Sequence, residues 1–153
     1  MPAFDPVESH RILSADAFNR TWDLLDLAER TPSQDREMLL LAHASLWHWT
    51  QREDFGDRQL SVGLWMLARV HAVLGLGDAA RHHAVACLAA SAGESPFYLA
   101  YAHEAAARAA GVTGDEADKS RHLESAWILA TRIEDPGERE MLERDLASLA
   151  TPD

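Results

Sequence analysis

Side chains that could do chemistry gather in one short stretch, residues 43–49, which reads His-Ala-Ser-Leu-Trp-His-Trp. One hypothesis is a small-molecule or metal-binding, enzyme-like site around His43, Ser45 and His48, joined by Glu104 from a later part of the chain. The alternative is a packed helix crossing, in which each histidine and tryptophan finds one hydrogen bond. The sequence leaves both interpretations open.

Known catalytic and metal-binding motifs do not fit the chain. His103-Glu104 begins like the zinc-protease helix His-Glu-x-x-His, but the fifth residue is Ala107, so the second ligand is missing. His82 and His83 are adjacent and point to different faces of a helix, and no two histidines are four residues apart. No glycine-rich phosphate loop follows a strand. We therefore predict no catalytic residue, no metal and no cofactor, with ligands drawn from separate helices left open.

Composition limits the partners. The net charge is −11 and Lys119 is the single lysine, which argues against a nucleic-acid partner because no basic run offsets the acidic field. The apolar runs are too short to span a bilayer and the first residues show no signal-peptide pattern, so we expect no membrane partner. Cys87 has no second cysteine with which to form an internal disulfide. A reducing, cytoplasmic location fits this cysteine usage.

Apolar residues recur at helical spacing along the chain, and no alternating run rich in valine, isoleucine and threonine predicts a strand. We predict an all-α fold of six or seven helices, stacked as antiparallel hairpins. Ser14 is the predicted N-cap of the first long helix, and the residues before it are an arm or a short helix. The single domain, residues 1–153, then contains a degenerate hairpin (14–52), two further hairpins (57–92 and 96–134) and a capping helix (136–149).

Two units of the chain, residues 64–88 and 102–127, each repeat the order helix, glycine-containing turn, helix. Large and small apolar residues in these units fall in a pattern that resembles the tetratricopeptide repeat. The matching positions are Leu64, Leu67, Ala68, His71, Ala80, Ala84 and Cys87 in the first unit, and His103, Ala106, Ala107, Ala110, Lys119, Leu123 and Ala126 in the second. Small residues at the hairpin crossings (Ala68, Ala80, Ala84, Ala107) allow helices to approach closely.

The resemblance implies a non-catalytic scaffold that binds a protein or peptide segment in a concave groove lined by the first helix of each hairpin. Trp65 and Arg69 are matched 39 residues later by Glu104 and Arg108, and Tyr101 lies about one turn before Glu104. We expect these residues to form the binding surface. Arginine binds carboxylates through two parallel hydrogen bonds, so the expected partner carries an acidic group or a free C-terminus.

Two alternatives to this groove stay open. Arg108 and Glu104 are four residues apart, so they could form an ordinary ion pair on a solvated helix face and bind nothing else. The terminal hairpins could also present an exposed apolar strip through which two copies form a homodimer.

Overall fold

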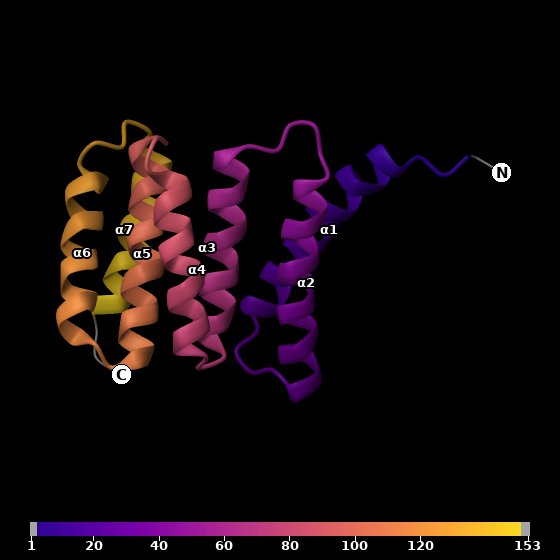
Figure 1. The fold of residues 1–153 in the computed structure, drawn as a ribbon. Coiled ribbons are helices and arrows are strands. Elements are labelled where there is room, and N and C mark those ends of the chain that lie inside the picture. The colour runs from indigo at the N-terminus through magenta and orange to yellow at the C-terminus, as the bar shows by residue number, and fades with distance from the viewer. Residues whose placement is uncertain (1–2, 151–153) are drawn as a thin grey trace.

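The computed structural model describes residues 3–150, and within that range the chain forms seven helices and no strand (Figure 1). The all-α hairpin arrangement is confirmed. Residues 1–2 and 151–153, the two ends of the predicted domain, lie outside the described residues. The helices are α1 (Pro6–Leu25), α2 (Pro32–Thr50), α3 (Asp57–Val73), α4 (Gly77–Ser91), α5 (Pro96–Thr113), α6 (Glu116–Ala130) and α7 (Pro136–Ala150).

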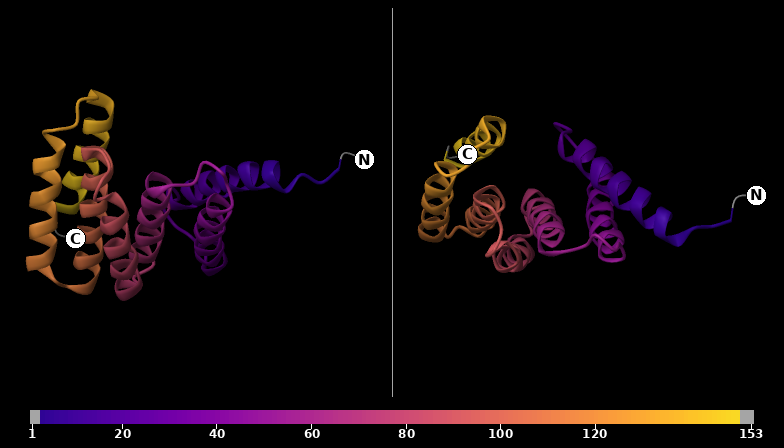
Figure 2. Two further views of the ribbon diagram at one scale, coloured as in Figure 1. Left: turned by 45° about the horizontal axis from the view of Figure 1, so that its top comes forward. Right: turned by 90° about the horizontal axis from the view of Figure 1, so that it is seen from above.

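Consecutive helices pack against each other, and α5 is also in contact with α3 and α7. The helix α1 lies across α2 (Figure 2). Seen end-on, the helices follow an arc, with α1 and α7 at its two ends on the same side and α4 on the opposite side (Figure 2). The face between α1 and α7 is therefore the concave face of the stack, and α3 and α5 form its floor.

A glycine in the left-handed conformation follows the C-terminal end of α3 and of α5. Gly75 and Gly114 have φ values of 76° and 78°, a left-handed conformation that costs glycine little because it has no Cβ atom. The amide of Leu76 then donates to the carbonyl of His71 at 2.8 Å, and the amide of Asp115 donates to Ala110 at 2.9 Å. These bonds satisfy carbonyls at the helix end and turn the chain into the next helix.

Alanine fills the contact between α3, α4 and α5. Ala68, Ala80 and Ala84 form a buried cluster with Ala105, Ala106 and Ala109 of α5. Ala68, Ala80, Ala84 and Ala107 are all at most 1% exposed, as expected for small residues at helix crossings. Short side chains let the helix backbones approach, so many small dispersion contacts replace a few large ones. Trp65 and Leu88 pack at the margin of this alanine cluster.

The predicted start of the first helix at Ser14 is wrong. The helix begins at Pro6, where the Asp5 carboxylate accepts hydrogen bonds from the amides of Val7 and Glu8. Aspartate before a proline at the first helical position is a strong start signal, because the missing proline N–H would have no helical partner. The first hairpin consequently spans residues 6–50 instead of 14–52.

Ser14 instead holds α1 against α2. Its side chain is fully buried, its carbonyl accepts from the Ser45 hydroxyl at 2.9 Å, and its hydroxyl accepts from Arg52 Nη1 at 3.0 Å. A serine hydroxyl serves equally well as a cap or as a buried bridge, so its type does not distinguish the two.

Helix ends differ elsewhere by a few residues. The helix α5 continues to Thr113, where Gly114 ends it. The hairpin predicted to span residues 96–134 ends with α6, at Ala130. The capping helix α7 matches its predicted range, and its buried Leu142 and Leu146 face the rest of the stack.

In the described part of the chain, no helix is both long enough and apolar enough to cross a membrane. Cys87 is fully buried, and burial raises the pKa of its thiol to about 11. The protonated thiol is a poor nucleophile, which fits a packing role.

The alanine packing makes a prediction. Ala84→Leu should lower the free energy of unfolding by about 1–3 kcal/mol, because the added carbons have no room between α3 and α4. Ala89→Leu, on the exposed side of the same helix, should change it by less than about 0.5 kcal/mol. Urea unfolding measures both, and equal effects at the two positions would contradict the close packing.

Candidate functional site

Glu104 of α5 is fully buried, and both of its carboxylate oxygens are held by donors from two helices. Oε2 accepts from the indole Nε1 of Trp65 at 2.9 Å. Oε1 accepts from Arg69 Nη1 at 3.0 Å and from the Nε and Nη2 groups of Arg108 at 2.9 and 2.6 Å. Since a buried charge is costly unless paired and hydrogen-bonded, these donors are what allow a carboxylate here.

A second carboxylate, Asp145 of α7, extends this network. Its Oδ2 accepts from the Tyr101 hydroxyl at 2.8 Å, and its Oδ1 lies 3.8 Å from Arg69 Nη2. Burial, and then the neighbouring Asp145, raise the pKa of Tyr101, so the phenol stays protonated and donates. Burial lowers the pKa of Arg69, which the nearby Glu104 opposes. The guanidinium of Arg69 thus joins α3 to both α5 and α7.

The residues expected to form the binding surface are therefore brought together. Trp65 and Tyr101 meet edge to face with ring centroids 5.6 Å apart, and both stand beside the Glu104 network. The Arg108–Glu104 pair of the alternative interpretation also forms, but its carboxylate is buried instead of solvated. Both guanidinium groups are engaged by Glu104, so an incoming acidic group would meet donors that are already partly used.

Beside this network, a cavity of about 250 Å³ opens between α1, α3, α5 and α7. Its walls are mostly aromatic, and Met141 and Asp145 of α7 close one side. The aromatic rings are those of Phe18, Trp22, Trp65, Phe97, Tyr98 and Tyr101. We call this the aromatic pocket. An apolar cavity with a single carboxylate at its edge suits one large side chain of a ligand.

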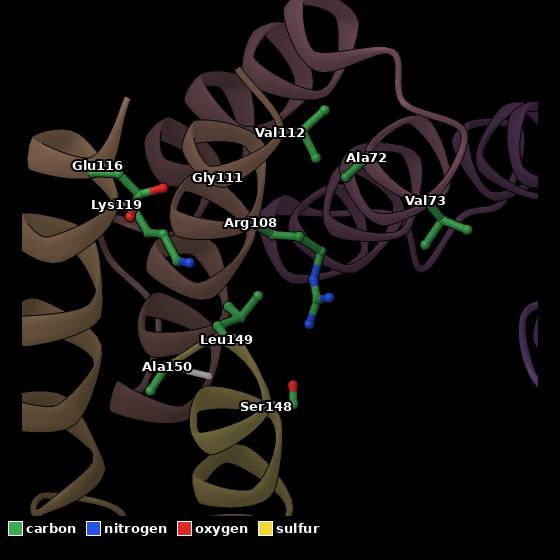
Figure 3. A pocket seen from close by; sticks show the side chains of 10 residues that line it. All are labelled: Ala72, Val73, Arg108, Gly111, Val112, Glu116, Lys119, Ser148, Leu149 and Ala150. Carbon is green, nitrogen blue, oxygen red and sulfur yellow. The ribbon is translucent and has the colours of Figure 1, made fainter. Parts of the chain in front are cut away.

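A larger cavity, of about 700 Å³, lies further along the same helices, between the C-terminal parts of α3, α5 and α7 and the start of α6. Figure 3 shows Arg108 extending into it toward the side of Ser148. Lys119 and Glu116 contribute from α6, so two cations and one anion line the cavity. We call this the basic cavity; its local charge is opposite to the net charge of the chain.

The residues of the alternative site lie in different environments. His43 packs against the rings of His71 and His83, and the Ser45 hydroxyl donates to the Ser14 carbonyl. His48 shares a hydrogen bond with His10, Nδ1 to Nδ1 at 2.9 Å, and Glu104 belongs to the network described above. The fold therefore does not bring these four side chains together at one point.

Sequence reasoning missed three contributors to the concave face. Phe18 and Trp22 belong to α1, and none of the residues expected to form the binding surface comes from this helix. Asp145 lies on the capping helix between the buried Leu142 and Leu146. From the sequence alone, a carboxylate at this position is expected to be solvated. No spacing rule connects position 145 to position 69, so only the docking of α7 reveals the contact.

Comparison with protein-family models, with curated proteins and with solved structures finds no match for this chain.

The buried carboxylate makes a second prediction. Glu104→Gln should lower the free energy of unfolding by about 3 kcal/mol, because the arginines lose their counter-charge and the amide N–H group must face other donors. Glu140→Gln removes the carboxylate from an exposed pair with Arg144, and should cost less than about 0.5 kcal/mol. Chemical denaturation of the two variants compares them, and similar losses would contradict the role of Glu104.

A histidine pair predicts a pH effect. His103 and His122 share a 3.0 Å hydrogen bond between α5 and α6. Burial lowers the pKa of each; the partner lowers that of His103 further, while Asp118 opposes the shift at His122. The unfolded chain, with histidine pKa near 6.5, therefore binds more protons than the folded chain.

The stability that this pair influences should accordingly be highest above about pH 6.5 and fall as the pH is lowered below that value. His122→Gln removes one of these titrating groups and should make that fall shallower. Denaturant titrations at several pH values give the slope. An unchanged slope would mean that the pair does not contribute.

Proposed function

We propose that this protein is a non-catalytic scaffold, similar in plan to tetratricopeptide repeat proteins, that binds a peptide or protein segment along its concave face. The observation that carries the proposal is the aromatic pocket. It lies on the face shared by α1, α3, α5 and α7, and its six rings come from three of these helices. Large rigid rings supply contact area at little entropic cost, which is why aromatic side chains dominate binding surfaces.

The order of the two cavities supports an extended ligand. Tyr101 lines the aromatic pocket and Arg108 lines the basic cavity, seven residues later on the same helix. At about 1.5 Å of rise per residue, the two positions are about 10 Å apart. An extended peptide covers that distance in about three residues. A suitable segment therefore carries a large apolar side chain, with an acidic group or its free C-terminus about three residues away.

The charges lining the two cavities indicate which end of the ligand lies in which cavity. Arg108 gives Nε and Nη2 to Glu104, and Lys119 of α6 also lines the basic cavity. A carboxylate entering this cavity meets both cations, whereas the rest of a chain with net charge −11 repels it. The basic cavity is thus the end at which the acidic group binds. A cytoplasmic location, suggested by the single buried cysteine, completes the proposal.

A matched pair of synthetic peptides tests the proposal. Each has phenylalanine three residues before its end in an alanine and serine background, and one ends in a free carboxylate, the other in an amide. Fluorescence polarisation should show the acid peptide binding at least tenfold more tightly, which corresponds to about 1.4 kcal/mol for one charge-assisted contact. Met141→Arg, which places a long side chain at the aromatic pocket, should weaken both peptides.

Two control variants make the test specific. Arg108→Gln should remove the preference for the acid peptide, whereas Arg132→Gln, at an exposed position outside both cavities, should keep it. The Val85→Arg variant, changed at an exposed position of α4, should bind both peptides as tightly as the unmodified protein does. Binding that is insensitive to Met141→Arg and to Arg108→Gln would place the ligand elsewhere and overturn the proposal.

A further inference from the structure

Three histidines from three different helices converge on the side of the stack formed by α2, α3 and α4. They are His43 of α2, His71 of α3 and His83 of α4, and one ring nitrogen of each lies within 4.8 Å of the other two. The ring centroids are 4.9 to 6.0 Å apart. His71 is buried, His83 is half-buried and His43 is exposed, so the cluster reaches from the core to solvent.

These separations are close to those of a metal site. Three imidazole nitrogens at about 2.0–2.1 Å from a tetrahedral zinc ion are about 3.4 Å from one another. The widest separation in the cluster must therefore close by at most about 1.4 Å. His43 is the most exposed of the three, and rotation of its side chain about χ1 and χ2 can supply part of this movement.

The orientation of His71 favours metal binding. Its Nδ1 lies 2.7 Å from the carbonyl oxygen of Leu67, which can only accept, so Nδ1 carries the proton. In the neutral ring, Nε2 then has a free lone pair. Histidine ligands in metal sites commonly donate their other N–H to a backbone carbonyl, which fixes the tautomer and the ring plane. The helix therefore presents His71 in the form that a metal requires.

The protonation state supports the same conclusion. Burial, followed by the neighbouring His71, His43 and His82, lowers the pKa of His83 to about 4. Burial and then His71 also lower the pKa of His43. Neutral imidazole is the ligand form, so at pH 7 a metal ion would displace few protons from these two rings.

We infer that His43, His71 and His83 form a binding site for a divalent transition metal of the zinc class, with a water molecule as the fourth ligand on the exposed side. Three nitrogen donors without a carboxylate suit zinc, copper or nickel and do not suit magnesium or calcium, which prefer oxygen ligands. The ion would tie α2 of the first hairpin to both helices of the second. The role of the ion would be structural: it would fix the position of the first hairpin relative to the second.

This site is independent of the proposed peptide-binding function, because none of its three ligands lines the aromatic pocket or the basic cavity. The inference departs from the expectation of no metal, and it takes up the possibility, left open by the sequence, of ligands drawn from separate helices. Spacing rules look for ligands on one helix, whereas each of these ligands comes from a separate one.

Zinc titration of the full chain, stripped with a chelator beforehand, tests the inference. Calorimetry should show one saturable Zn²⁺ site per chain, and zinc should raise the melting temperature. His83→Gln and His43→Gln should each weaken the site by at least tenfold. His43 is exposed, so its replacement leaves the fold intact, which circular dichroism verifies. In nitrogen-15 NMR, zinc should shift the ring resonances of the three ligands.

The other histidine pairs provide the matched controls. His48→Gln and His122→Gln each remove one ring from a different close pair and should leave zinc affinity unchanged. Cobalt(II) should give the strong visible absorption of a tetrahedral site in these controls and lose it in His83→Gln. No saturable binding, or binding that His48→Gln or His122→Gln weakens while His43→Gln and His83→Gln do not, would overturn the inference.

Discussion

The buried carboxylate of Glu104 is the constraint around which the concave side of this protein is built. A charge removed from water costs several kcal/mol unless donors replace its hydration. Here an indole and two guanidinium groups do so, and they come from α3 and α5. Hydrogen bonds tolerate only small errors in distance and angle, so the network sets the register of one helix against the other.

Asp145 extends this hydrogen-bond and ion-pair network to the capping helix α7. Tyr101 and Arg69 both reach it, so α7 is positioned by polar contacts as well as by its buried leucines. The aromatic pocket forms where these helices meet α1. Its shape depends on α7, because Met141 and Asp145 make one wall. The structural network and the candidate binding surface thus share residues, and the same interactions that stabilise the stack also shape the pocket.

Packing differs between the two sides of α3 and α5. Alanines fill the seam with α4, where helices approach closely and leave little space. Large rings line the concave side, where they cannot interdigitate as closely and a cavity remains. Under the proposed function, folding has already ordered the side chains of this open aromatic face, so binding a ligand there would cost little further conformational entropy.

Local chemistry in the sequence was enough for the helices, their hairpin turns and the alanine seam, because caps, glycine turns and 3.6-residue periodicity act over a few residues. It also indicated Trp65, Arg69, Glu104 and Arg108 through their 39-residue spacing, and Tyr101 through its place one turn before Glu104. Ser14 was misread because a hydroxyl fits a cap and a buried bridge equally. The tertiary structure alone decided that Glu104 is buried, that Asp145 joins it and that His43, His71 and His83 meet. Those distances depend on how helices cross, and helix crossing follows from the volumes of many side chains at once, which no local pattern records.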